Sequence, residues 1–324
     1  MSSRTLLSSD ATGGTLPPSR AAVYKQPQVL PNLGYGIGLR PCHYQEVLRH
    51  RPGQTIDGVR APDWLEVISE NAMDDHGHTR HILHRIAEHY PLVFHGVSLS
   101  IGSSDPLQTA YLQRLKKLCD EFSPAWISDH LCWTGVGGIN SHDLLPLPLT
   151  AANLRHVISR VHQVQEQLGR RLILENPSSY MRFKSSDIPE WEFFNALCSA
   201  TGAGILLDLN NVYVSAFNLG FKAHHYLDNL QLHHIAQVHL AGPRHLGTHI
   251  IDTHESPVVD AVWELYQKLI RKTGAISTLL EWDANIPAFP ELMQELDKAR
   301  HWQQQCLHVE NSNPDHTATV AISI

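Results

Sequence analysis

The sequence lacks the long apolar stretch and the leader that mark membrane and secreted proteins. No apolar run approaches the roughly 20 residues that a helix needs to cross a bilayer. Met1–Arg20 is rich in Ser, Thr, Gly and Pro and has no apolar core of the kind that signal peptides carry. We therefore expect a cytoplasmic protein without a membrane partner.

Paired cysteines and an excess of basic residues are also missing. Five cysteines are scattered without a CxxC pair, which is typical of reduced thiols in the cytosol rather than of a disulfide framework. The chain has 25 Lys and Arg against 32 Asp and Glu, and a net charge of −7 with neutral histidines. This balance gives no general basic field and argues against nucleic acid as a partner.

Histidine, in contrast, is abundant: the 324 residues include 23 of them. Histidine is the commonest protein ligand of metal ions. Several histidines fall in loop or helical stretches and are expected at the surface, namely His76, His78, His81, His84, His224, His225, His233 and His234. The position of the others decides whether a metal site exists.

Eight short apolar runs recur at intervals of roughly 30 to 45 residues, the length of a strand, loop and helix unit. Near-continuous apolar runs are typical of strands that are buried on both faces of a parallel sheet. The runs are Gly34–Leu39, Trp64–Ser69, Leu92–Leu99, Ala125–His130, Leu172–Glu175, Gly204–Asp208, Ile235–Leu240 and Ser277–Trp282.

Helical periodicity separates these runs. Apolar residues recur on one helical face in 107–122, 150–168, 258–270 and 289–302, and Thr150 and Gly169 are expected to cap the second of these helices. Eight strand–helix units predict an α/β fold, a (β/α)8 TIM barrel, over residues 31–305; an open doubly wound sheet is the alternative. Residues 1–30 and 306–324 are expected to be flexible, disordered tails.

Ionisable residues interrupt the apolar runs in a consistent place, near the C-terminal end of each strand. They are His95, His130, Glu175, Asp208, His239 and Glu281. A barrel brings these strand ends together on the face where its active sites lie. Burying so many ionisable groups costs several kcal/mol each unless they are paired or bind metal. The pattern therefore predicts a metal site.

Two loops add further candidate ligands. Asn211 follows Asp208 by three residues, and Asp252 and His254 lie in the loop after the seventh run. Alternate residues of an extended segment point the same way, so Asp252 and His254 are expected to chelate one ion. Residues expected to orient the ligands or to contact substrate, with ordinary strand-end capping as the alternative, are Glu70, Asn71, Asp129, Asn176, Asn210 and Asp283. Cys132 is expected to be a packed thiol.

The order of these ligands resembles the trinuclear site of the xylose-isomerase-like barrels, notably the apurinic endonucleases of DNA repair. In that family a histidine stands at the position of Asn211. With this departure, the chain is more similar to the multinuclear non-haem iron-dependent oxidases, typified by the methanobactin-biosynthesis oxidase. The motifs that carry the resemblance are HGVSLSIG (95–102), SDHLCW (128–133), LENPSSY (174–180), LLDLNNVYVSAFN (206–218), HLAG (239–242) and LEWDANIP (280–287).

The resemblance, which covers roughly residues 31–300, implies three ion sites. One site would be formed by His95, His130 and Glu175. A second would be formed by Glu175, Asp208, His239 and Glu281, with Glu175 as the bridge. A third would be formed by Asn211, Asp252 and His254. Imidazole, carboxylate and amide ligands without a thiolate suit Fe, Mn or Zn, and the preference for two or three iron ions (Fe2+/Fe3+) rests on the family.

The resemblance also implies the reaction. It predicts an oxidase that uses O2 to modify a cysteine of a ribosomally made precursor peptide, with Glu175, Asp208 and His239 as catalytic residues and a helper protein that presents the leader peptide. The alternatives are a metal-dependent phosphodiesterase or endonuclease, a sugar isomerase or epimerase, and a metal-storage module. An isomerase usually needs a catalytic lysine or paired carboxylates, and none of the strand ends carries a lysine.

Overall fold

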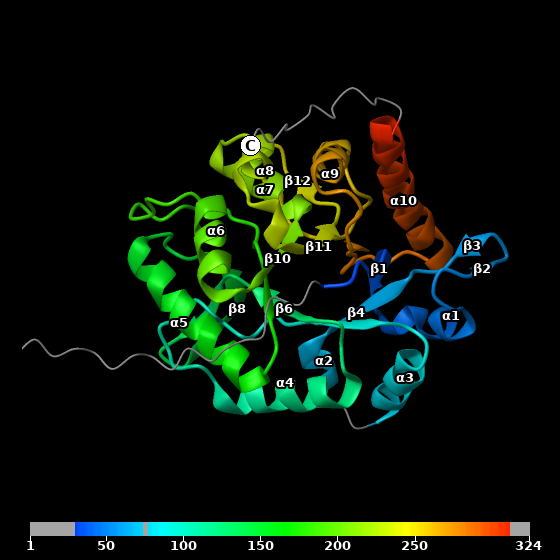
Figure 1. The fold of residues 1–324 in the computed structure, drawn as a ribbon, viewed down its shortest axis with the longest axis horizontal. Helices are drawn as coiled ribbons and strands as arrows, with labels where there is room; N and C mark the ends of the chain where they lie inside the picture. Colours follow the sequence, from blue (N-terminus) through cyan, green and yellow to red (C-terminus); the bar gives the residue numbers. More distant parts are fainter. Residues whose placement is uncertain (1–29, 74–76, 312–324) are drawn as a thin grey trace, which may run out of the picture.

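The computed structural model describes residues 30–73 and 77–311, in which eight parallel strands close into a barrel (Figure 1). Around the barrel the strands follow the order β1, β14, β11, β10, β9, β6, β5 and β4, and β4 pairs with β1 to close it. They are β1 (Tyr35–Gly38), β4 (Trp64–Ile68), β5 (Leu92–His95), β6 (Ile127–His130), β9 (Leu172–Glu175), β10 (Gly204–Asp208), β11 (Ile235–Leu240) and β14 (Thr278–Leu280). The predicted barrel is confirmed, and the open sheet is excluded.

Helices follow the strands and cover the outside of the barrel; α4 and α9 lie on opposite sides of it in Figure 1. The helices are α1 (Tyr44–Arg49), α2 (Ser69–Met73), α3 (His78–Ala87), α4 (Thr109–Phe122), α5 (Ala151–Leu168), α6 (Glu190–Thr201), α7 (Leu209–Leu219), α8 (Ala223–Asn229), α9 (Asp260–Thr273) and α10 (Phe289–Asn311). The predicted caps of α5 are present: Thr150 accepts a hydrogen bond from the backbone N–H of Asn153, and Gly169 adopts a left-handed conformation.

Short antiparallel hairpins extend the loops at both ends of the barrel. Hairpin β7–β8 (Trp133–Val136 and Ile139–Leu145) follows β6, and hairpin β12–β13 (Arg244–His245 and Ile250–Ile251) follows β11. Both therefore belong to the face formed by the C-terminal strand ends. Hairpin β2–β3 (Thr55–Ile56 and Val59–Arg60) precedes β4 and lies at the other end. The turns Pro41–His43 and Leu232–His234 are short 3-10 helices.

The barrel interior is filled in layers, because alternate residues of a strand point to the same face. Its lower part is apolar and includes Trp64, Val93, Trp126, Ile173, Leu206 and Leu279. Two residues further along the same strands, the inward positions are polar: Glu66, His95, Ser128, Glu175, Asp208 and Glu281. The barrel interior therefore has an apolar layer, and directly above it a polar layer formed by the next inward residue of each strand.

Most element bounds lie within three residues of those expected, and two differ by more. The third strand ends at His95 rather than Leu99, because the backbone N–H groups of Val97 and Leu99 donate to the carboxylates of Glu70 (3.0 Å) and Asp129 (3.1 Å) instead of to a strand. Helix α10 runs beyond the expected domain end at residue 305, where buried Cys306 packs into the core. The expected tails 1–30 and 306–324 otherwise lie almost wholly outside the described residues.

Gly242 brings the end of β11 into close contact with the loop that carries His254. A Cβ at this position would lie 2.1 Å from the carbonyl oxygen of Ser256 and 2.3 Å from that of Pro257. Backbone atoms cannot move aside as a side chain can, so we expect Gly242→Ala to lower the free energy of unfolding by about 3 kcal/mol in urea unfolding. Gly220, with φ +74° and open space around it, provides the matched control; Gly220→Ala should cost only about 1 kcal/mol. Equal losses in the two variants would contradict the close contact.

Candidate metal centre

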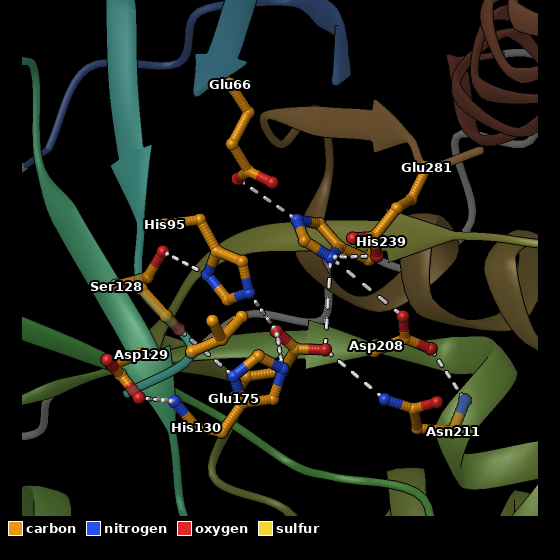
Figure 2. A network of polar contacts seen from close by, with 12 residues as sticks. Glu66, His95, Ser128, Asp129, His130, Glu175, Asp208, Asn211, His239 and Glu281 are labelled. Atoms are coloured by element: carbon orange, nitrogen blue, oxygen red, sulfur yellow. Dashed lines mark hydrogen bonds and ion pairs between the residues drawn. The ribbon is translucent and has the colours of Figure 1, made fainter. Parts of the chain in front are cut away.

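Side chains from six consecutive units of the barrel meet above its apolar floor (Figure 2). Their strands, or the residue directly after the strand in the case of Glu281, carry them to the C-terminal face. All are nearly completely buried: His95, His130, Glu175, Asp208, His239 and Glu281. The structure thus brings together the six strand-end residues that the sequence singled out.

The first group consists of His95, His130 and Glu175. Glu175 Oε2 lies 3.1 Å from His95 Nε2 and 3.3 Å from His130 Nε2. The other ring nitrogens are held from behind, since His95 Nδ1 contacts Ser128 Oγ at 2.8 Å and His130 Nδ1 contacts the carbonyl oxygen of Gly96 at 3.2 Å. Both rings therefore present Nε2 to the same carboxylate oxygen, and one ion could be held by all three residues.

The second group shares Glu175 and adds Asp208, His239 and Glu281. His239 Nδ1 lies 3.0 Å from Glu281 Oε2 and 3.9 Å from both Glu175 Oε1 and Asp208 Oδ2. One ligand atom from each of the four residues lies within 4.8 Å of the others. Glu175 thus faces the first group with Oε2 and the second with Oε1, the arrangement of a carboxylate that bridges two ions.

The third predicted group is arranged differently. Asp252 Oδ1 lies 2.6 Å from His254 Nε2, as expected for side chains that point the same way. His254 Nδ1 contacts Glu281 Oε2 at 3.3 Å and Asp283 Oδ2 at 3.1 Å, so the residues that could hold a third ion are His254, Glu281 and Asp283. Asp283, which was expected to orient a ligand or to contact substrate, also pairs with Arg40.

Asn211 turns toward the second group. Its Nδ2 donates to Glu175 Oε1 (3.2 Å) and to the carbonyl oxygen of Asn176 (3.1 Å). This position follows from the N-terminal turn of α7, where the side chain of Asp208 caps the helix by accepting from the backbone N–H of Asn211. The Asn211 amide therefore orients Glu175, and its Oδ1 is left without a hydrogen-bond partner.

Unpartnered polar atoms mark where cations would sit. Among the described residues, buried atoms without a hydrogen-bond partner include Glu175 Oε2, Asp208 Oδ2, Asn211 Oδ1, His239 Nδ1 and His254 Nε2. Some of these atoms lie within ion-pair distance of an imidazole nitrogen or a carboxylate oxygen, but none of them forms a hydrogen bond. Buried polar atoms are rarely left unpaired. These residues fit divalent metal ions.

The electrostatics of the centre also require positive charge. Burial would lower the pKa of His95, but the carboxylates of Glu66 and Glu175 outweigh it and raise the pKa to about 9. Burial would raise the pKa of Glu175, yet the surrounding imidazoles lower it to about 2. At Asp208 burial prevails and holds the pKa well above its ordinary value. Without a metal ion, protonated imidazoles such as that of His95 balance the negative charge of the carboxylates.

Most of the residues expected to orient ligands contact the centre. Asn176 exchanges two hydrogen bonds with the backbone of Asp208 (3.0 and 2.9 Å), and Asn210 Nδ2 donates to Asp252 Oδ1 at 2.7 Å. Asp129 accepts from the backbone N–H groups of Leu99 and His130. Glu70 accepts from Tyr111 and from the backbone of Val97, whereas Asn71 is exposed on α2. Buried Cys132 is a packed thiol.

Sequence reasoning missed Glu66 and Ser128. It considered residues at the ends of apolar runs, and both of these lie inside a strand. Alternation along the strand could have found them, because residues two apart point to the same face. Glu66 lies two residues after the inward Trp64, and Ser128 lies two after the inward Trp126. A charged residue at an inward position of a buried strand is a candidate for the polar layer.

The centre opens into a cavity of about 260 Å³. Besides the ligands, its walls include Asp143 and Leu144 of hairpin β7–β8, and Ser178 and Tyr180 from the loop after β9. Among the described residues that line it, none is a lysine or an arginine. A ligand in this cavity would meet carboxylates, imidazoles and any bound cations, but no lysine or arginine among the described lining residues.

Residues 34–304 match the family of RiPP precursor modification enzymes MbnB/TglH/ChrH, which act on ribosomally synthesised peptides. The chain belongs to this family. Two relatives of this chain are UPF0276 proteins. The protein from Anaeromyxobacter sp. (strain Fw109-5) is 49% identical over 267 residues, which cover 82% of this chain and 92% of the relative. The protein from Caulobacter vibrioides (strain NA1000 / CB15N) is 44% identical over 268 residues, or 82% and 93% of the two chains.

The fold of this chain is similar to that of solved xylose-isomerase-like TIM barrels. Endonuclease IV from Thermus thermophilus matches with a TM-score of 0.52 and 16% identity over 84% of this chain and 99% of that chain. A xylose isomerase-like TIM barrel protein from Mycobacterium smegmatis in complex with magnesium matches with a TM-score of 0.50 and 11% identity, covering 85% and 98%. At these identities the likeness concerns the fold. No described helix has the length and apolar character needed to cross a membrane.

Proposed function

We propose that this enzyme is a multinuclear iron-dependent oxidase that uses O2 to modify a cysteine of a ribosomally made precursor peptide in the cytoplasm. The family supports the peptide substrate. One structural observation carries the metal centre: Glu175 is shared by two groups of buried ligand atoms. The ligand residues are His95, His130, Glu175, Asp208, Asn211, His239, Asp252, His254 and Glu281, and Asp283 is a further candidate.

When bound, an iron pair would supply a Lewis acid for the substrate thiolate and a redox centre for O2. The protein's own residues would position that chemistry. Glu175 would hold the two ions side by side, and Asp208 and His239 would complete the second. The cavity walls at Ser178 and Tyr180 would orient the peptide at the open side of the centre. A helper protein that presents the leader peptide is part of the proposal.

The hydrolase alternative fits the cavity less well. A nuclease must hold phosphates, which lysine and arginine ordinarily contact. The described cavity lining has neither residue, and the chain has a net charge of −7. A sugar isomerase that relies on a lysine is disfavoured by the same lining. The buried, strand-anchored ligands also favour catalysis over reversible metal storage.

Anaerobic loading with Fe2+ tests the function. The loaded protein should consume O2 when a cysteine-bearing peptide encoded beside its gene is co-expressed or added, and the peptide mass should change. Replacing that cysteine by serine should prevent the change. Zinc in every site of protein purified without oxygen, together with no O2 consumption, would reject the proposal. Incision of abasic DNA by the purified protein would favour the nuclease instead.

A further inference from the structure

A buried glutamate outside the three ligand groups lies directly beneath the metal centre. Glu66 is in the middle of β4 and is 2% exposed. Its Oε2 lies 3.2 Å from His239 Nε2, whereas His239 Nδ1 faces Glu281 at 3.0 Å. Figure 2 shows Glu66 approaching the imidazole from the side opposite to Asp208 and Glu281. His239 Nε2 also lies 2.7 Å from Gln237 Nε2, so this nitrogen faces Glu66 and Gln237, whereas Nδ1 is directed at the ligand group.

Glu66 is itself held in place by a chain of hydrogen bonds. Gln237 Nε2 donates to Glu66 Oε2 at 2.6 Å, and Trp126 Nε1 donates to Gln237 Oε1 at 2.6 Å. Glu66 and Gln237 come from β4 and β11, which are not neighbours in the barrel, and Trp126 directly precedes β6, so these hydrogen bonds cross the interior. Gln237 and Trp126 are almost fully buried. The chain orients the Glu66 carboxylate toward His239.

A carboxylate in such a place is costly unless it has a partner. Among the described residues, no lysine or arginine forms an ion pair with Glu66; its polar contacts are with Gln237 and His239. Of these two partners Gln237 is neutral, and His239 Nε2 lies 3.2 Å from the carboxylate oxygen. A change at Glu66 is therefore expected to alter the orientation and the protonation of the His239 ring.

We propose that Glu66 is a positioning residue for the second ion, the one held by Glu175, Asp208, His239 and Glu281. It accepts a hydrogen bond from the Nε2–H group of His239, which leaves Nδ1 unprotonated and directed at the ion. A carboxylate on the far nitrogen fixes the tautomer and ring orientation of a histidine ligand and makes the near nitrogen a stronger donor. The inference rests on the proposed function, because it requires a cation at the centre.

Metal binding by Glu66→Gln tests this role. The wild type and the variant are loaded anaerobically with Co2+, and the ions that each retains are counted against increasing concentrations of a chelator. We expect the variant to hold one ion 10- to 100-fold more weakly, the range for lost orienting partners of a metal ligand, and the other ions as tightly as the wild type. The ligand-field absorption of the weakened ion should also change.

Glu190→Gln is the matched control. It makes the same chemical change at another enclosed glutamate, whose Oε1 accepts from Tyr226 Oη at 2.9 Å and whose pKa burial raises to about 7. Glu190 lines a different cavity. This variant should retain all ions with wild-type affinity and an unchanged Co2+ spectrum.

The outcomes separate the two proposals. Wild-type protein that retains no ion overturns the proposed function, and the role of Glu66 with it. Wild-type metal binding together with unchanged affinity and spectrum in Glu66→Gln overturns the role of Glu66 alone. So does an unfolding midpoint lowered in Glu66→Gln while its loaded spectrum stays the same, because that result indicates a structural role. Should Glu66→Gln fail to fold, Glu66→Asp keeps the charge but withdraws it by one methylene, and the same ion should be weakened.

Discussion

Glu175→Ala is expected to abolish peptide modification and to empty two ion sites at once. Glu175 is the residue that both of the first two ligand groups share, with Oε2 near His95 and His130 and Oε1 near His239. Its removal takes a ligand from each group and leaves the imidazoles without their carboxylate. The affinity for each ion should fall by more than about 100-fold, beyond the loss caused by removing an orienting partner. Metal analysis after dialysis, combined with peptide mass measurement, checks both effects.

Asn211→Ala is the control for this variant. Asn211 contacts Glu175 through its amide, but it belongs to neither of the first two groups. Because Asn211 orients Glu175 rather than belonging to either group, we expect this variant to retain both ions, bound at most 10- to 100-fold more weakly. Retention of both bridged ions and of turnover by Glu175→Ala would contradict the shared-carboxylate centre.

Removing the metal ions should lower the unfolding temperature by on the order of 10 °C. A ligand that binds only the folded state stabilises it by about 2.7 kcal/mol when its concentration is 100 times its Kd, so two ions contribute about 5 kcal/mol. For a chain of this size, 1 kcal/mol corresponds to roughly 2 °C. Calorimetry of protein dialysed against a chelator and of protein reloaded with Fe2+ measures the shift. Identical midpoints would contradict buried metal sites.

The metal-free protein should also lose stability at alkaline pH. In the folded state Glu66 and Glu175 outweigh the effect of burial and raise the pKa of His95 from its ordinary 6.5 to about 9. Its stabilising contribution, about 3 kcal/mol, is therefore fully present below pH 6.5 and is lost as the pH rises through 9. Urea unfolding at pH 6.5 and 9.5 should show this loss in the chelated protein. Protein loaded with Co2+ should lose less, since a bound ion replaces the protons.

The barrel and six of its polar residues could be predicted from the same feature, the apolar runs and the ionisable residues near their C-terminal ends. Apolar runs indicated the strands, and the residue that ended each run, such as His130 or Asp208, had to lie at the C-terminal face. Closure of the barrel then brought these residues together without further assumptions. This feature concerns the ends of runs, however, and so it passed over Glu66, which interrupts its strand in the middle.

The third group was harder to predict, because loop residues do not follow the strand period. Asp252 and His254 do meet, at 2.6 Å, but His254 adopts a left-handed backbone conformation, which turns its ring toward Asp283. The capping bond between Asp208 and the backbone of Asn211 likewise directs Asn211 to Glu175. Such contacts depend on three-dimensional packing, and spacing along the chain does not contain them.

Anomalous diffraction at the iron edge, from crystals of protein purified without oxygen, tests the central claim most directly. We predict an iron peak bounded by His95, His130 and Glu175, and a second peak bounded by Glu175, Asp208, His239 and Glu281. Glu175 should lie between the two peaks and contact both. The absence of anomalous density among these residues, or a lone peak that Glu175 does not touch, would contradict a centre built on a bridging carboxylate.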